Sequence, residues 1–467
     1  MDLTWKRPLA WENYTDDNKK SMEAVAGRYI GFLSAAKTER LAVDTIVSQA
    51  KAAGYVDIST LKNAEPGTKC YWNQNGKAVV LFVIGKKPMV EGLRIVGAHV
   101  DNPRLDLKPN PLYESNGLAF FDTHYYGGVK KYQWTALPLA LHGVVVCKDG
   151  RKVLINIGED ASDPVLGITD LLPHLGRDQM EKTMSKGITG EGLDALVAST
   201  PVPKDKDENG NDKDVKDPVK QWVLRWLHDK YQISEADFTS ADLQLVPAGP
   251  AREYGLDRSF IMGFGHDDRV CSWAAWAALL DMPVPEYTSA ALLTDKEEVG
   301  SIGATGAEGH FFEDAVAELL ALQAPYTELA LRRCLRLSKG LSGDVSNGYD
   351  PLYAEVSDPN NSAYMGKGFC ICRYVGGGGK GGTIEATPEF MAWLRALLDG
   401  HGICWQVPEL GKVDQGGGGT IAKFLGNYGM DCVDAGIPLF SMHAPWELAH
   451  KADLYEMYRA FTVFYQA

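Results

Sequence analysis

The stretch Thr294-Asp295-Lys296-Glu297-Glu298-Val299-Gly300-Ser301 places two adjacent carboxylates directly after an apolar run, residues 287–293. That run is small and apolar, which predicts a buried strand. Gly300, Gly303 and Gly306 predict a loop before the next helix. Two like charges this close raise the pKa of one carboxyl unless a cation shares the site. A metal ion suits such a pair, because one carboxylate can bind it while the other accepts a proton. Most Glu-Glu pairs lie on the solvated surface, so the case for a metal site depends on the rest of the chain.

The composition is that of a globular protein with an excess of negative charge. The chain has 467 residues, of which 45% are hydrophobic and 23% are charged, and its formal net charge is -14 at pH 7. This length exceeds one ordinary core and predicts two or three domains. The negative charge repels phosphate backbones, so we expect no nucleic acid partner.

The sequence predicts a cytoplasmic protein. No apolar run is long enough to cross a bilayer, and the N-terminal residues lack the apolar segment of a signal peptide, so we expect no membrane partner. Eight cysteines are scattered without a Cys-x-x-Cys spacing, and Cys370 and Cys372 are expected on one face of a strand. This pattern favours a reduced protein without structural disulfides.

Helix and strand patterns predict an α/β fold with a β-rich insertion. Residues 15–54 have a helical period, and after residue 250 helices and short apolar strands alternate. Residues 107–246 instead show short alternating strands and many glycines. We therefore expect a discontinuous catalytic domain, residues 1–106 and 247–467, and an inserted domain, residues 107–246. The strands expected in the catalytic domain include residues 77–84, 93–98, 287–293, 335–341, 369–374, 403–407 and 437–440.

Three stretches are expected to be loops. The charged stretch 204–220 predicts an exposed segment. Two glycine-rich stretches, residues 376–382 and 416–419, lack the spacing of a phosphate-binding loop. They are interpreted either as mobile loops near a binding site or as plain flexible surface.

Polar residues occur at or just after several predicted strands. His99 follows the strand 93–98, and Asp101 two residues later can orient its ring. Asp344 follows the strand 335–341, and His443 follows the strand 437–440. Asp267 opens a helix that is expected to begin at residue 268. Each residue alone has a structural explanation, such as a helix cap, a turn or a packed histidine.

Together these residues predict a metal site. The ligands that follow strands are expected at the carboxyl edge of an open α/β sheet, where ligands bind. One bridging carboxylate would give two sets of three ligands, and each set would keep an open position for water or substrate. Imidazole and carboxylate ligands suit zinc, with cobalt or manganese as alternatives. The candidate residues at strand ends are His99, Glu297, Glu298, Asp344 and His443.

The order of these motifs resembles the aspartyl aminopeptidase family, relatives of vacuolar aminopeptidase I among the dizinc aminopeptidases. The motifs are His-x-Asp-x-Pro at 99–103, Asp-Asp-Arg at 267–269, Asp-x-Glu-Glu-Val-Gly-Ser at 295–301, Ser-x-Asp at 342–344 and Ser-Met-His at 441–443. The resemblance covers nearly the whole chain, including an insertion between the first two motifs. It implies a mixed-sheet zinc-peptidase domain and an inserted β-rich dimerisation domain.

The resemblance also implies a role for each residue. His99 and Asp344 would bind one zinc, Glu298 and His443 the other, Asp267 would bridge them, Asp101 would support His99, and Glu297 would be the general base. The segment 172–175 resembles an inserted-domain segment whose histidine reaches a neighbouring subunit's site, which would make His174 catalytic. A surface or packing role fits that short match equally well. Family members form dimers that assemble into a hollow dodecamer, so we expect a homo-oligomer.

Four positions depart from the family pattern. Asn347 stands where a histidine is usual, and Trp446 stands where an arginine usually precedes the glutamate. Val100 and Asn102 stand where small hydroxyl residues are common. None of these is a predicted ligand. Substrate selection depends on such lining positions, so the preference for acidic N-terminal residues that the resemblance implies stays open.

The expected function is a dinuclear-metal aminopeptidase that removes the N-terminal residue of peptides. One alternative keeps the two metals but changes the substrate, as in a deacylase or amidohydrolase on the same scaffold. The other alternative is a non-catalytic peptide-binding assembly. The complete ligand set argues against the second, because a scaffold does not need paired carboxylates.

Overall fold

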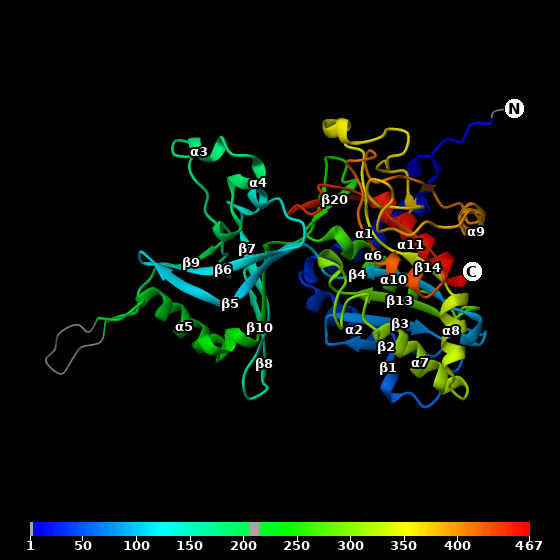
Figure 1. Cartoon of the computed structure of the whole chain (residues 1–467), viewed down its shortest axis with the longest axis horizontal. Helices are drawn as coiled ribbons and strands as arrows, with labels where there is room; N and C mark the ends of the chain where they lie inside the picture. Colours follow the sequence, from blue (N-terminus) through cyan, green and yellow to red (C-terminus); the bar gives the residue numbers. More distant parts are fainter. Residues whose placement is uncertain (1–2, 205–213) are drawn as a thin grey trace. The chain divides into compact units, whose positions relative to one another are not determined.

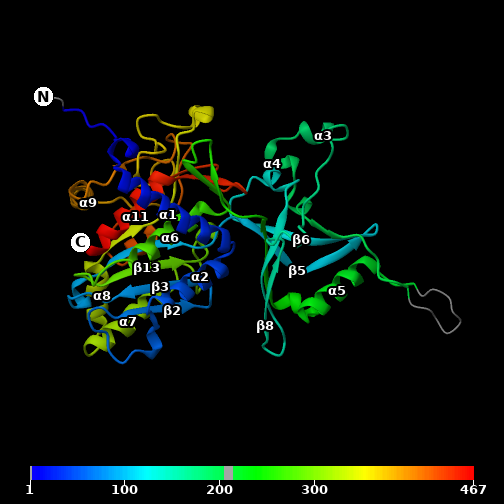
Figure 2. The ribbon, with the colours of Figure 1, turned by 180° about the vertical axis from the view of Figure 1, so that it is seen from behind.

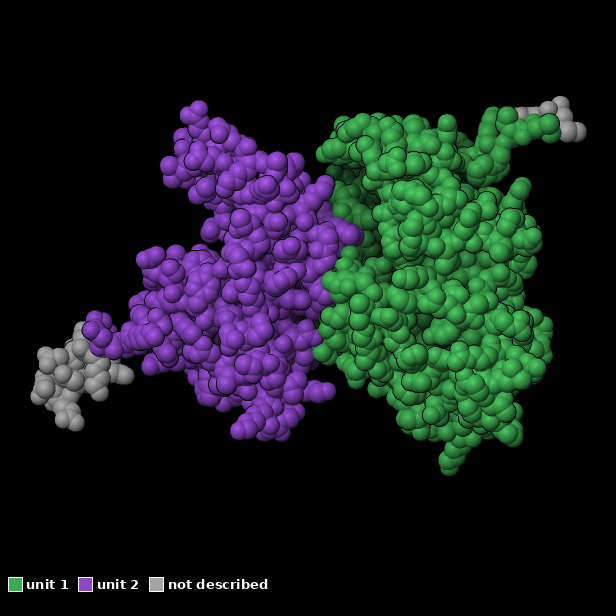
Figure 3. Space-filling view, in the orientation of Figure 1, with its two compact units in different colours: residues 1–102, 251–442, 446–467 green, residues 103–250, 443–445 purple. Residues whose placement is uncertain are grey.

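The computed structural model describes residues 3–204 and 214–467. Contacts within the chain divide it into two compact units (Figure 3). Unit 1 consists of residues 1–102, 251–442 and 446–467, and unit 2 of residues 103–250 and 443–445. The assignment of a catalytic and an oligomerisation role to two domains, 1–106 with 247–467 and 107–246, stays a prediction.

Unit 1 is built around a mixed nine-stranded sheet (Figure 1). β13, β4, β14 and β18 run parallel at its centre, β3 and β16 flank them antiparallel, and β2 runs antiparallel to β3. The three neighbouring strands β3, β13 and β4 are buried along their whole lengths. In order across the sheet the strands are β1 (Val56–Asp57), β2 (Lys69–Gln74), β3 (Ala78–Val83), β13 (Ser289–Thr294), β4 (Arg94–His99), β14 (Lys339–Ser342), β18 (Asp431–Gly436), β16 (Phe369–Cys372) and β17 (Trp405–Gln406).

Helices cover both faces of this sheet, which explains why its central strands are apolar throughout (Figures 1 and 2). Val79 and Leu81 of β3 belong to the core on one face, and Val80 and Phe82 belong to the core on the other. This is the alternation of a strand that is buried on both sides. The first face packs against α1 (Asp16–Ala35), α2 (Glu39–Ala52), α6 (His266–Leu280), α9 (Pro388–Gly400) and α11 (Lys451–Gln466), and the second against α7 (Phe311–Gln323), α8 (Glu328–Leu337) and α10 (Ala422–Asn427).

The N-terminal helical region is two helices and not one. α1 ends at Ala35, and Thr38 begins α2 by accepting a hydrogen bond from the Leu41 N–H. Such a threonine cap satisfies one of the open amides of a first helical turn. The cap also fixes the position of Glu39 in the first turn of α2, where its side chain is buried.

One expected strand of unit 1 differs from the structure, and a central strand of its sheet was not expected. The predicted strand 335–341 was wrong in its first half, because α8 continues to Leu337 and β14 begins at Lys339. Leu331 and Leu335, one helical turn apart, bury the same face of α8 and so extend the helix. β18 was missed, because Asp434 interrupts its apolar pattern, although the strand is buried beside β14.

A second, five-stranded sheet in unit 1 carries the strand that leads to His443. Its strands in order are β11 (Arg252–Tyr254), β12 (Phe260–Gly263), β20 (Glu447–His450), β19 (Pro438–Phe440) and β15 (Ser346–Asn347). The expectation that every ligand follows a strand of one sheet was therefore wrong for His443, which follows β19. Local apolar pattern predicts a strand but not the sheet that the strand joins.

The described residues of unit 2 form a six-stranded antiparallel sheet and three α-helices. Its strands in order are β8 (Lys152–Ile157), β7 (Leu139–Val146), β10 (Ala241–Pro247), β5 (Arg104–Ser115), β6 (Leu118–Tyr126) and β9 (Ala195–Ala198). Within the charged stretch 204–220, residues 205–213 lie outside the described residues, and α5 (Pro218–Tyr231) already begins at its end. None of the described helices has an apolar stretch of the length needed to cross a bilayer.

Candidate metal centre

The two glutamates of the opening stretch lie in a short 3-10 turn directly after β13. This turn, Glu297–Val299, begins after Lys296 in the left-handed conformation (φ 70°). Asp101 fixes the turn, since its two carboxylate oxygens accept hydrogen bonds from the Glu297 N–H (3.1 Å) and the Glu298 N–H (3.2 Å). The backbone of the turn is thus tied to the segment that follows β4, and both glutamate side chains are half-buried.

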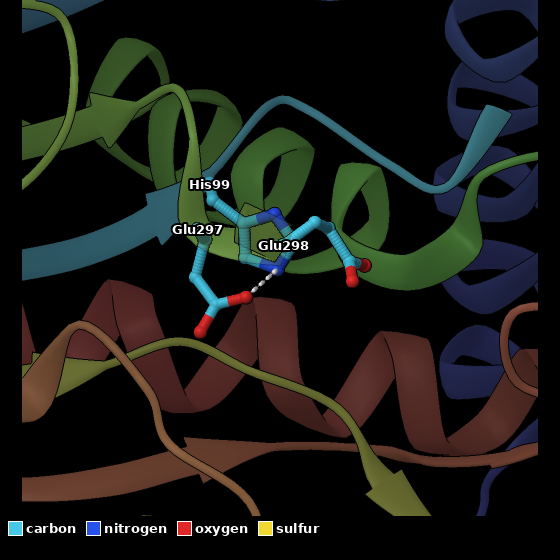
Figure 4. A group of neighbouring side chains, drawn as sticks. All are labelled: His99, Glu297 and Glu298. Carbon is cyan, nitrogen blue, oxygen red and sulfur yellow. Dashed lines mark ion pairs between the residues drawn. The ribbon is translucent and has the colours of Figure 1, made fainter. Parts of the chain in front are cut away.

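His99 is the last residue of β4 and is buried beside these carboxylates. Its Nδ1 lies 3.1 Å from the Asp101 carbonyl oxygen and 3.3 Å from Asp101 Oδ1. Its Nε2 lies 3.2 Å from Asp267 Oδ1 and 3.9 Å from Glu297 Oε2. Figure 4 shows the Glu297 carboxylate directed toward the imidazole, with Glu298 on the same turn.

The pKa of His99 shows that these residues favour a positive charge. Burial lowers the pKa of His99, but the hydrogen bonds to Asp101 and Asp267 and the charge of Glu297 outweigh it. The pKa of this imidazole is therefore well above its ordinary value. A cation held between these carboxylates would be stabilised in the same way.

Asp267 reaches this group from the first turn of α6. Its N–H donates a 3.1 Å hydrogen bond to Glu447 Oε2, which positions the aspartate from β20. The Asp267–Asp268 peptide bond is cis, and both residues depart from helical geometry. Asp268 Oδ1 accepts a hydrogen bond from the Cys271 N–H (3.3 Å), three residues further along α6.

Asp344 completes the group from the segment that follows β14. It is half-buried, and its Oδ1 accepts a hydrogen bond from the Val345 N–H (2.8 Å). Burial and then the charges of Asp267 and Glu297 raise the pKa of Asp344 well above its ordinary value. This carboxyl therefore becomes ionised more easily when a cation joins the group.

Among the described residues of unit 1, two sets of three residues could hold a metal ion. One set is His99, Asp267 and Asp344, and the other is His99, Glu297 and Glu298. In each set one ligand atom per residue lies within 4.8 Å of the others. A set of imidazole and carboxylate donors fits zinc, which binds nitrogen and oxygen ligands at about 2.0–2.2 Å.

The two predicted histidines outside these sets belong to unit 2. His443 lies three residues after β19 in the segment 443–445, and its Nδ1 lies 2.9 Å from the Gly128 carbonyl oxygen. His174 lies in an exposed turn before the short helix α3 (Arg177–Met180). The roles predicted for both residues stay predictions.

Two of the positions that depart from the family pattern, Asn347 and Trp446, have clear surroundings in the structure. Asn347 lies in β15, opposite Leu439 of β19. The Trp446 ring lies 5.8 Å from the ammonium of the buried Lys37, so a cation lies next to the position where an arginine is usual. The sequence assigned no role to Glu447. Nothing near a single glutamate indicates that its side chain accepts a hydrogen bond from the Asp267 N–H.

Comparison with known proteins identifies the family. The model of the family described as aminopeptidase I zinc metalloprotease (M18) matches residues 32–465. The chain belongs to the M18 family of zinc aminopeptidases. It is 48% identical to a probable M18 family aminopeptidase 1 of Clostridium acetobutylicum, over 99% of both chains. The expected enzyme class and fold class are thus confirmed, and the alternatives of a deacylase or a scaffold are not favoured.

Solved structures of M18 aminopeptidases match the whole chain. The crystal structure of the Thermotoga maritima enzyme has a TM-score of 0.94 and 39% identity, and covers 99% of this chain and 100% of that one. Aminopeptidase I of Clostridium acetobutylicum has a TM-score of 0.92 and 45% identity, with 100% of both chains covered. The mApe1 dodecamer of Saccharomyces cerevisiae shares the fold, with a TM-score of 0.76, 21% identity and coverage of 96% and 97%.

Proposed function

We propose that this M18 aminopeptidase works with two zinc ions held by five side chains. His99, Asp267 and Asp344 would hold one ion, and Asp267, Glu298 and His443 the other, with Asp267 shared. The observation that carries the proposal is the first set, in which three separate elements, β4, α6 and the segment after β14, bring their ligand atoms within 4.8 Å. For the second ion, the support is Glu298 on the turn beside His99 and the place of His443 just after β19.

Bound zinc would supply Lewis acidity for the carbonyl of the scissile bond and for the attacking water. Glu297 would take the proton of that water and pass it to the leaving amine. Its carboxylate is suited to this role because Asp101 holds its backbone in place while the side chain keeps 14% of its surface exposed. The surrounding carboxylates would attract the free α-amine of a peptide, which favours removal of the N-terminal residue.

A glutamate-to-glutamine pair of variants tests the assignment of the base. Glu297→Gln should lower kcat by about 10²–10⁴-fold, because a positioned base contributes that much. Its zinc content should match that of the wild type. Glu308→Gln is the matched control, since Glu308 is exposed in the same loop after β13. Near-normal turnover of Glu297→Gln with full zinc content would contradict the assignment.

Substrate preference is proposed from the family resemblance alone. We expect acidic N-terminal residues to be cleaved fastest, although Asn347 and Trp446 differ from the usual family residues. A panel of aminoacyl anilides, run with zinc, cobalt and manganese in turn, measures the preference. N-acyl amino acids in the same panel should not be hydrolysed, and their rapid hydrolysis would favour a deacylase.

We also propose a homo-oligomer, with unit 2 at the contacts between subunits and a dodecamer built from dimers as the assembly. The support on this chain is a run of apolar side chains in unit 2 that are at least half exposed: Leu171, Leu172, Leu175, Met180 and Met184. Exposed apolar runs of this kind mark protein interfaces. Replacing Leu175 and Met180 by glutamate should lower the mass measured by light scattering. His174 lies within this run, which suits the predicted contact with a neighbouring subunit.

The cellular location is proposed from the cysteines. All eight are free and buried thiols, although Cys370 and Cys372 lie two residues apart on β16. Free thiols in this number are typical of a reducing compartment, so we propose a cytoplasmic enzyme. Fractionation of cells that produce the protein would test this directly.

A further inference from the structure

Lys77 and Asp295 lie opposite each other at the ends of two neighbouring strands. β3 and β13 pair antiparallel, with Val79 level with Leu293. Continuing this register by two residues places Lys77, just before β3, opposite Asp295, just after β13. In the structure the Lys77 ammonium lies 3.9 Å from Asp295 Oδ2.

The same ammonium also forms an ion pair with a second buried carboxylate. Lys77 Nζ lies 2.8 Å from Glu39 Oε1 in the first turn of α2. The side chains of Glu39 and Asp295 are fully buried, and that of Lys77 is 14% exposed. Buried carboxylates need a compensating charge, so Lys77 links α2 to the segment after β13. Burial and Glu39 raise the pKa of Asp295 to about 6, and Lys77 acts against that rise.

Asp295 closes the loop that carries the two glutamates. Its N–H donates to the Thr305 carbonyl (3.0 Å), and the Thr305 hydroxyl donates to its Oδ2 (2.8 Å). Gly306, directly after Thr305, lies so close to Ser301 that an added Cβ would stand 2.1 Å from the Ser301 carbonyl oxygen. The loop is therefore closely packed at its base. Asp101 also holds the turn, through the hydrogen bonds from the Glu297 and Glu298 N–H groups.

We infer that Lys77 is a positioning residue for Glu297 and Glu298. It holds the Asp295 carboxylate at the base of the 295–305 loop, and this carboxylate fixes the orientation of the turn above it. The catalytic consequence rests on the proposed function, in which Glu297 is the base and Glu298 a zinc ligand. The consequence for the loop itself, which is held in place before any metal binds, does not rest on the proposed function.

The test compares two lysines at opposite ends of β3. Lys77→Met removes the buried cation, and Lys86→Met removes an exposed one whose Nζ lies 3.7 Å from Glu286 Oε2. In the metal-free protein, hydrogen exchange of the amides at 296–306 should become faster in Lys77→Met and stay unchanged in Lys86→Met. In the zinc-loaded protein, kcat of Lys77→Met should fall by about 10- to 100-fold, because a misplaced catalytic group loses orientation. KM should stay close to the wild-type value, and Lys77→Arg should recover most of the lost kcat.

Unchanged exchange at 296–306 together with wild-type kcat in Lys77→Met would overturn the inference. A failure of Lys77→Arg to recover kcat would also count against it, because the positive charge is the property invoked. If Lys77→Met does not fold, Lys77→Gln removes the charge and keeps a polar side chain, and the same measurements should then show effects in the same direction. If the wild-type enzyme hydrolyses no aminoacyl substrate, the proposed function fails while the exchange comparison still tests Lys77.

Discussion

Two groups of acidic residues in unit 1 differ in their surroundings. The edge cluster consists of His99, Asp267, Glu297, Glu298 and Asp344. The α11 cluster consists of Asp453 and Glu456, which face the core from the C-terminal helix. Asp453 accepts hydrogen bonds from the Gly366 N–H (2.8 Å) and the Gly368 N–H (2.6 Å), and Glu456 accepts from the Cys404 N–H (2.9 Å).

The pKa shifts separate the two groups by their causes. Burial raises the pKa of Asp453 to about 8. The hydrogen bonds from Gly366 and Gly368 act to lower it, and the charge of Glu456, the smallest of these causes, adds to the rise. Burial also raises the pKa of Asp344, but there the next causes, the charges of Asp267 and Glu297, raise it further. Carboxylates that repel one another around a histidine are suited to bind a cation, whereas carboxylates bonded to backbone amides hold a fold together.

The largest expected effect is on activity. Asp344→Asn should lower kcat/KM by at least about 100-fold, because losing even a supporting residue of a metal site costs 10–100-fold. Zinc bound per chain should fall with it. Asp453→Asn, the matched change in the α11 cluster, should keep zinc content and kcat/KM near the wild-type values. Equal losses of kcat/KM in the two variants would remove the distinction between the clusters.

A smaller effect is expected on zinc affinity. Asp101→Asn should weaken zinc binding by about 10–100-fold, measured by competition with a chelator, as for other residues that support metal ligands. The reason is that both oxygens of Asp101 accept backbone hydrogen bonds from the turn at Glu297 and Glu298, and an amide offers one acceptor oxygen. Asp281→Asn is the control, since Asp281 pairs with Arg28 at a half-exposed surface. Wild-type affinity in Asp101→Asn would contradict this role.

The smallest effect concerns the pH dependence of stability. Because the pKa of Asp453 is about 8 in the folded protein and about 4 when unfolded, the folded state binds more protons between these values. The free energy of unfolding of the metal-free protein should therefore fall as pH rises from about 5 to about 8. Asp453→Asn should make this slope shallower by up to about 1.4 kcal/mol per pH unit, in urea titrations at several pH values. An unchanged slope would show that Asp453 is not the group that titrates.

The sequence predicted the residues of the edge cluster better than their supports. His99 and Asp344 were expected after strands and Asp267 at the start of a helix, and their ligand atoms lie within 4.8 Å of one another. Glu447 and Lys77 were not assigned a role, because each acts through a partner more than 150 residues away. Such pairs depend on which strands are neighbours, and no local pattern shows that β3 lies beside β13.

The errors in the fold have related causes. The strand expected at 335–341 was displaced because the apolar spacing of Leu331 and Leu335 fits a helix that continues to Leu337. β18 was missed because a buried aspartate, Asp434, breaks its apolar run. The Thr420 hydroxyl, which donates to this carboxylate, lies 14 residues earlier in the chain and outside the strand. The periodicity of apolar residues does not reveal a buried polar residue whose partner lies on another element.

The central claim is that five side chains hold a pair of zinc ions with Asp267 between them. Anomalous diffraction from zinc-loaded crystals, recorded on both sides of the zinc absorption edge, tests it most directly. The account predicts two zinc peaks per chain, one in contact with His99, Asp267 and Asp344 and one in contact with Asp267, Glu298 and His443. Zinc peaks located away from Asp267, or a single peak that the Glu298 carboxylate does not contact, would contradict it.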